Sequence, residues 1–276
     1  MPRIIFPFLL LLLLPAPLLA QRTLWTYGTA RTVPENQQEF GLIHPLQMGV
    51  SPTMEISVQP LMALALAPNL TLKKRWTSDR WLLASQHTYV MPTMALRTMQ
   101  DLGFQTRKDT LGERHPLIPD TLTIPYIFML RNEVLLSRRI GSETMLTAKA
   151  GFAFSIRTRT DSLPPLNHPL LYMYGSTLDP RILSYAGIRI DGNIVRNYNY
   201  MADVTFLASG LLRTWALEHR AYFIWNKSIR FAALAGYKMS YGNYPFDPKF
   251  AIFPMVDLIW KINIQPQKPE RDLFRQ

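Results

Sequence analysis

The sequence predicts an all-β fold: a transmembrane antiparallel up-and-down β-barrel of about twelve strands, with ten strands as the alternative count. Three observations predict it. Apolar residues recur at every second position over strand-length segments, charged residues gather on the opposite parity, and the connections are alternately short and long. A barrel in lipid has apolar outward faces, polar inward faces and tight turns at one end, which accounts for all three patterns.

The composition supports this class and excludes others. The 276 residues are 48% hydrophobic and 12% aromatic, which excludes a disordered chain. The absence of cysteine excludes a disulfide scaffold and a thiolate metal site. Only 18% of the residues are charged, below the roughly 25% usual in soluble domains. This combination favours a protein whose surface partly faces lipid.

The chain divides into three parts. Residues 1–20 are expected to be a cleaved signal peptide, because Arg3 precedes an apolar run that ends at a proline and then Ala20. Residues 21–264 are expected to form the barrel, and residues 265–276 a polar periplasmic tail. Beyond residue 20, no stretch approaches the ~18 apolar residues that a membrane-spanning helix needs.

Period-two alternation is clearest in three segments. In residues 54–65 the even positions Met54, Ile56 and Val58 are apolar, whereas Glu55 and Ser57 are polar. The same alternation runs through residues 144–158 and 251–264. Successive side chains of a strand point to opposite faces, so each segment is expected to have one apolar and one polar face.

The charged residues indicate which face of each predicted strand lines the lumen. In the segments 144–158, 194–208, 213–225, 229–240 and 251–264, nine of eleven charged residues share the polar parity, and Arg196 and Arg213 are the exceptions. A lipid-bathed strand must keep its ions inside. With Glu55 of residues 54–65 added, the residues expected to face the lumen are Glu55, Lys149, Arg157, Asp203, Glu218, Arg220, Arg230, Lys238, Asp257 and Lys261.

Counting connections backwards from residues 251–264 yields eleven strands, the first at 37–46, with 47–53 as a loop. Both termini on one side of the membrane require an even number, so residues 23–32 are expected to supply the twelfth strand. Pro60, Pro125 and Pro254 fall inside proposed strands and weaken them. Residues 92–102 have helical spacing and predict a short amphipathic helix.

Aromatic residues are expected to mark the membrane interfaces. Two tryptophans flank the turn at residues 77–80, where a girdle of aromatic rings would lie. The residues assigned to this aromatic girdle are Trp25, Trp76, Trp81, Trp215, Trp225 and Trp260.

With its signal peptide, alternating strands, girdle aromatics and final amphipathic strand at 257–262, the chain resembles the outer-membrane β-barrel proteins of Gram-negative bacteria as a class. The resemblance implies a location in the cell outer membrane, contact with its lipid and lipopolysaccharide, and folding by the barrel-assembly machinery. One departure is the polar tail from Gln265 to Gln276, where many such proteins end on an aromatic residue.

The sequence contains few candidates for catalytic or metal-binding residues. Ser85 and His87 share one face of a strand and are the best candidates for a nucleophile and a base, but neither has an assignable acid partner. No His-x-His or His-Glu-x-x-His spacing occurs, so neither a metal nor another cofactor is expected. We therefore expect no enzyme, with an outer-membrane lipid or lipopolysaccharide hydrolase as the alternative.

The leading functional expectation is a non-enzymatic barrel. It is either a narrow channel for small, anionic solutes, because lumen cations outnumber lumen anions, or a structural barrel whose lumen is plugged by ions that pair with one another. A second alternative is a surface-adhesion or partner-docking barrel that acts through residues 91–121 and 159–182. The basic residues form no domain-sized stripe, so nucleic acid is not an expected partner. The sequence favours no oligomeric state.

Overall fold

The computed structural model describes residues 26–41, 43–77, 80–103, 116, 118, 120, 122–140, 143–158, 182–195, 197–209, 214–243 and 248–263. The expected signal peptide, the expected polar tail, Trp25 and nearly all of residues 159–182 lie outside this part of the chain.

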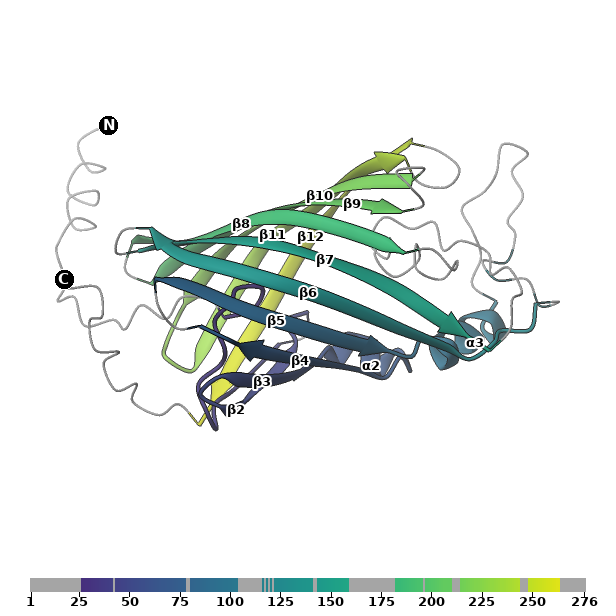
Figure 1. Cartoon of the computed structure of the whole chain (residues 1–276), viewed down its shortest axis with the longest axis horizontal. Helices are drawn as coiled ribbons and strands as arrows, with labels where there is room; N and C mark the ends of the chain where they lie inside the picture. Colours follow the sequence, from purple (N-terminus) through teal and green to yellow (C-terminus); the bar gives the residue numbers. More distant parts are fainter. Residues whose placement is uncertain are drawn as a thin grey trace, which may run out of the picture.

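The described residues form a closed antiparallel barrel of twelve strands (Figure 1). Each strand pairs with its neighbours in sequence, and β1 pairs with β12 to close the sheet. The predicted fold class and the count of twelve are confirmed. The strands are β1 (Gln38–Phe40), β2 (Leu46–Ser51), β3 (Met54–Val58), β4 (Asn69–Arg75), β5 (Trp81–Val90), β6 (Ile127–Ile140), β7 (Thr144–Arg157), β8 (Leu183–Val195), β9 (Tyr198–Ser209), β10 (Thr214–Asn226), β11 (Phe231–Asn243) and β12 (Pro248–Ile262).

The alternation of residues along the strands corresponds to the inner and outer faces of the barrel. In β7, Met145 and Thr147 are fully buried within the barrel, whereas Leu146 and Phe152 are exposed on its outer surface. The hairpin of β6 and β7 keeps this parity over its whole length, from the pair Ile127 and Arg157 to the pair Ile140 and Thr144. In this hairpin the exposed positions are mostly apolar, and the inner positions carry the charged residues Arg131, Glu133 and Lys149.

The expectation for the first strands is wrong in its details. Residues 47–53 were expected to be a loop, but Leu46–Ser51 form β2. The single expected strand at 37–46 is interrupted after Phe40, because the chain turns at Gly41, whose amide bonds to the carbonyl of His44. The twelfth strand is therefore β2, and the described part of the expected strand 23–32 forms no strand.

Two of the three prolines mark boundaries. Pro60 ends the expected strand 54–65 early, because it occupies the first turn of the helix α2 (Pro60–Leu64), a position that needs no backbone N–H. Pro125 lies just before β6. Pro254 remains inside β12. The predicted helix is present as α3 (Thr93–Asp101), followed by Gly103 with a φ of 62°. Among the described residues, no helix combines the length and apolarity needed to cross a membrane.

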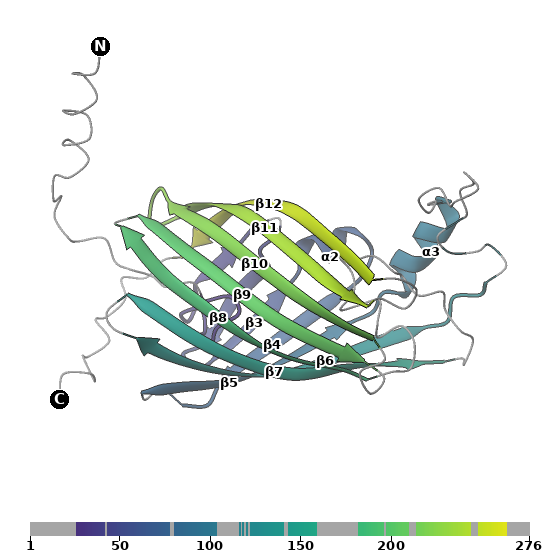
Figure 2. The same cartoon turned by 90° about the horizontal axis from the view of Figure 1, so that it is seen from above.

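The two ends of the barrel differ. At one end, here called the turn end, the connections are 52–53, 76–80, 141–143, 196–197 and 227–230. The other end, called the loop end, carries the long connections 91–126 and 158–182. Figures 1 and 2 show α3 beyond the strands at the loop end, where Leu96 packs against Val90 and Ile127 at the tops of β5 and β6. The first and last strand residues, Gln38 and Ile262, pair at the turn end.

The assignment of faces can be tested at two adjacent positions of β7. Phe154 lies on the outer parity, and Ser155 lies on the inner parity. Arginine on a lipid-facing position costs about 2–4 kcal/mol at mid-membrane and less toward the interface. We expect Phe154→Arg to lower the yield of folding into phospholipid vesicles far more than Ser155→Arg, as measured by heat-modifiable migration on gels. Equal effects would contradict the assignment.

Candidate functional site

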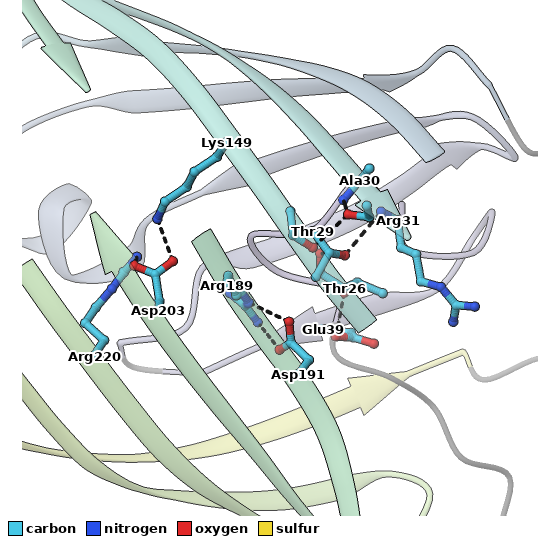
Figure 3. Close-up of polar contacts among 12 residues, drawn as sticks. Thr26, Thr29, Ala30, Arg31, Glu39, Lys149, Arg189, Asp191, Asp203 and Arg220 are labelled. Carbon is cyan, nitrogen blue, oxygen red and sulfur yellow. Dashed lines mark hydrogen bonds and ion pairs between the residues drawn. The ribbon is translucent and has the colours of Figure 1, made fainter. Parts of the chain in front are cut away.

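Residues 26–37, here called the plug segment, lie inside the barrel rather than in its wall (Figure 3). The amide of Ala30 donates to Ser137 Oγ of β6 at 2.8 Å, and the amide of Val33 donates to Glu55 Oε2 of β3 at 2.9 Å. Ala30 and Val33 are both completely buried. Wall side chains thus satisfy the backbone at Ala30 and Val33, whereas Asn36 and Gln37 exchange backbone hydrogen bonds with Gly49 of β2.

Two glycines make room for this segment. Gly28 has a φ of 75°, and a Cβ there would lie 2.3 Å from Nη1 of Arg189 in β8. At Gly49 of β2, a Cβ would lie 2.1 Å from the carbonyl oxygen of Pro34. A side chain at Gly49 would push the plug segment away from β2, because it would meet backbone atoms. A side chain at Gly28 would displace the Arg189 guanidinium.

Buried ion pairs surround the plug segment. Lys73 Nζ of β4 lies 3.1 Å from Glu55 Oε2 and donates to the carbonyl of Thr26 at 3.3 Å. Arg189 binds Asp191 through two hydrogen bonds of 2.8 and 2.6 Å. Each of these charges is almost fully buried. Charges so far from water are tolerated when they are paired and hydrogen-bonded, as here.

A second set of ion pairs lies beside Arg189, because Asp203 of β9 is its register partner. Asp203 of β9 binds Lys149 of β7 at 2.5 Å and Arg220 of β10 at 3.1 Å. Lys149 reaches across β8 at Gly187, where a Cβ would lie 2.7 Å from Lys149 Cε. The absence of a side chain at that position lets one ion pair span three strands.

The ten residues expected in the lumen are placed as follows. Seven of them take part in ion pairs inside the barrel: Glu55, Lys149, Asp203, Glu218, Arg220, Lys238 and Lys261. Asp257 accepts backbone hydrogen bonds from Ile43 and His44, and Arg157 lies on the inner parity of β7.

Arg230 departs from the expectation. It lies exposed in the turn between β10 and β11, because β11 begins one residue later, at Phe231.

Several charged residues that face the lumen were not predicted from the sequence. Besides Lys73, Arg189 and Asp191, these are Glu39, which binds Lys261 at 3.2 Å, and Glu133, which lies 3.4 Å from Arg131. A signal for some of them existed. In Arg131-Asn132-Glu133 and Arg189-Ile190-Asp191, opposite charges stand two residues apart, and two residues is the spacing that places side chains on one face of a strand.

The described tryptophans of the expected aromatic girdle lie on the outer surface. Trp76, Trp81 and Trp225 are exposed near the turn end, as is Trp260 close to the end of β12. Trp215 lies near the loop end, with its ring centroid 5.7 Å from that of Tyr241. Cations accompany two of the rings: Lys74 Nζ lies 4.2 Å above Trp76, and Arg138 lies 4.9 Å above Trp81.

Ser85 and His87 also lie on the outer surface, on the parity opposite to buried Ala84. His87 Nδ1 is 2.8 Å from Asn132 Oδ1, whereas Ser85 Oγ accepts a hydrogen bond from Trp76 Nε1 at 2.9 Å. The structure thus gives His87 an amide partner in place of an acid, and it ties Ser85 to a tryptophan instead of to His87. Within the described ranges, no cluster of three or more potential ligands could hold a metal ion.

Comparisons with known proteins give a distant similarity of fold. No family model matches the chain, and no curated protein matches it. Among solved structures, it is similar to in-vitro folded OmpT, an outer membrane protein of Vibrio cholerae, with a TM-score of 0.40 and 7% identity over 79% of this chain and 63% of that chain. The outer membrane channel DcaP of Acinetobacter baumannii matches with a TM-score of 0.35 and 12% identity, over 79% and 60% of the two chains. The chain thus spans less than two thirds of the length of either structure.

The ion pair beside the plug segment can be tested by removing its cation. Lys73→Met would leave Glu55 buried with one partner fewer, and breaking a buried pair in this way costs about 3–5 kcal/mol. We expect a correspondingly lower free energy of unfolding in urea, measured in detergent or lipid. Arg230→Met, which removes an exposed cation, is the matched control and should change the stability by less than about 0.5 kcal/mol. Equal losses would contradict the buried pairing.

Proposed function

We propose that this protein is an outer-membrane β-barrel whose lumen is plugged at its turn end by its own residues 26–37. In this arrangement the apolar outer faces contact lipid and the aromatic rings lie at the interfaces. By the usual rule for bacterial barrels, the turn end faces the periplasm and the loop end faces outward. Lipid, lipopolysaccharide and the barrel-assembly machinery are the partners that this placement implies.

The observation that carries the proposal is the docking of the plug segment on opposite walls of the barrel. Its backbone binds Ser137 in β6 and Glu55 in β3, and Gly28 lies against Arg189 in β8. Ser137 is three residues from the end of β6, and Glu55 is the second residue of β3, so these two contacts lie in the half of the barrel nearest the turn end. Arg189 is the central residue of β8. A segment held on three sides closes that half of the lumen.

The ion pairs argue against an open, anion-selective channel. The cations that would attract an anion, such as Lys149, Arg220 and Lys238, each lie within 3.1 Å of a carboxylate. A paired cation exerts a weaker field on a passing solute than a free one. Between the two leading expectations, the geometry therefore favours the plugged barrel, and conduction would require the plug segment to leave its site.

The other two alternatives receive less support. A lipid hydrolase needs a nucleophile bonded to its base, and Ser85 is bonded to Trp76 instead. A docking function would use residues 91–121 and 159–182, of which the structure describes chiefly α3.

Conductance in planar bilayers tests the proposal. Ala30→Glu places a charge at a fully buried site of the plug segment without changing the wall. We expect the natural sequence to conduct little, and this variant to conduct at least about tenfold more, because an unpaired buried charge disfavours the docked state by several kcal/mol. Glu35→Gln, at an exposed position of the same segment, is the control and should behave like the natural sequence.

Cross-linking the plug segment to the barrel wall provides the complementary test. The chain has no cysteine, so Ala30→Cys with Ser137→Cys can be joined by a short cleavable thiol cross-linker. The cross-linked protein should stay closed. A natural barrel that conducts freely, and equally well when cross-linked, would overturn the proposal.

A further inference from the structure

Two cations lie against tryptophan rings on three adjacent strands near the turn end. Lys74 Nζ of β4 is 4.2 Å from the centroid of the Trp76 ring, and the guanidinium carbon of Arg138 in β6 is 4.9 Å from that of Trp81 in β5. Trp81 and Arg138 are also register partners. Both rings are about half exposed. We call these four residues the cation–tryptophan surface.

The parity of the strands places both cations on the outer face of the barrel. Lys73 and Ser137, the residues next to Lys74 and Arg138, are buried and point into the lumen. Successive side chains of a strand point to opposite faces. Lys74 and Arg138 therefore lie on the surface that meets lipid in the proposed membrane placement, together with the two rings.

Hydroxyl groups hold the two tryptophans in place. Thr77 Oγ1 donates to the carbonyl of Trp81 at 2.8 Å and accepts a hydrogen bond from the amide of Leu83 at 2.9 Å, which fixes the turn between the rings. Trp76 Nε1 donates to Ser85 Oγ at 2.9 Å. A surface ordered in this way loses little conformational freedom when a ligand binds, and this favours affinity.

The charges of Lys74 and Arg138 are not balanced by the described residues. The lumen cations Lys149, Arg220 and Lys238 each lie within 3.1 Å of a carboxylate. Within the described ranges, Lys74 and Arg138 contact tryptophan rings but form no ion pair. A ring attracts a cation through its quadrupole but carries no net charge. An anion from outside the protein can therefore bind both cations.

The two cations lie where lipid headgroups would lie. Trp81 is the first residue of β5, and Trp76 directly follows β4, so both rings mark strand ends. Tryptophan is enriched at this level of a membrane, next to the headgroups. The guanidinium of Arg138 matches the geometry of a phosphate group, and the ammonium of Lys74 adds a second positive charge.

We propose that the cation–tryptophan surface binds the phosphate of an acidic phospholipid, such as phosphatidylglycerol, in the leaflet that faces the periplasm. The site rests on the proposed membrane placement, in which the turn end is periplasmic. An acidic headgroup fits better than a zwitterionic one, because the headgroup cation of phosphatidylcholine already balances its phosphate. The tryptophan rings would lie against the apolar part of the same lipid.

The test is native mass spectrometry of the full chain in detergent, with phosphatidylglycerol and phosphatidylcholine of identical acyl chains in competition. The measured quantity is the ratio of the two bound lipids. The test variant combines Lys74→Gln with Arg138→Gln. The matched control combines Lys227→Gln with Arg230→Gln, which removes two exposed cations from a turn at the same end of the barrel. Heat-modifiable migration confirms that each variant is folded.

We expect the natural sequence to prefer phosphatidylglycerol by at least about tenfold, since each cation near acidic lipid contributes roughly fivefold. The test variant should fall to about twofold or less, and the control should keep the preference. No preference in the natural sequence, or an equal loss in both variants, would overturn the site and leave the membrane placement intact. A stronger preference for lipopolysaccharide that the test variant abolishes would overturn the site and reverse the proposed orientation.

Discussion

Closure of the backbone hydrogen-bond ladder is the constraint on which this structure depends. In a bilayer no water is available to an unpaired N–H or C=O group, so a sheet that crosses must close on itself. Here the closing strand, β1, has only three residues. Where its ladder stops, the Asp257 carboxylate accepts hydrogen bonds from the backbone amides of Ile43, His44 and Leu258. One side chain thus satisfies the backbone at the end of the closing seam.

Much of the fold could be predicted because lipid imposes a strict alternation. The long strands from β6 to β12 have 12 to 15 residues each, enough to show the period of two and the parity of charge. The strands β1 and β2 were not separated correctly because three and six residues hold too few alternations. Residues 23–32, which include the first part of the plug segment, were expected to be a strand because the count had reached eleven and an even number was required. A segment surrounded by wall on several sides has no single polar face, so periodicity cannot identify it.

Charge parity indicated which residues turn inward but not which of them meet. Lys149 and Asp203 lie on β7 and β9, which are not neighbours in the sheet, and their contact depends on the register of β8 between them and on a glycine at position 187. Register is a property of the assembled sheet and leaves no local trace in sequence. By contrast, pairs along one strand, such as Arg189 and Asp191, follow from spacing alone. The sequence therefore contains a signal for ion pairs within one strand, but none for ion pairs between strands.

The plug segment depends on the short strands that begin the barrel. β1, β2 and β3 build only the half of their wall nearest the turn end, and it is there that the plug segment binds, through Glu55 of β3 and against Gly49 of β2. Toward the loop end these short strands do not continue, and among the described strands β12 pairs there with β11. In the proposed arrangement the plug segment closes the lumen toward the periplasm. A solute that entered from outside would therefore meet the ion pairs and the plug segment below it.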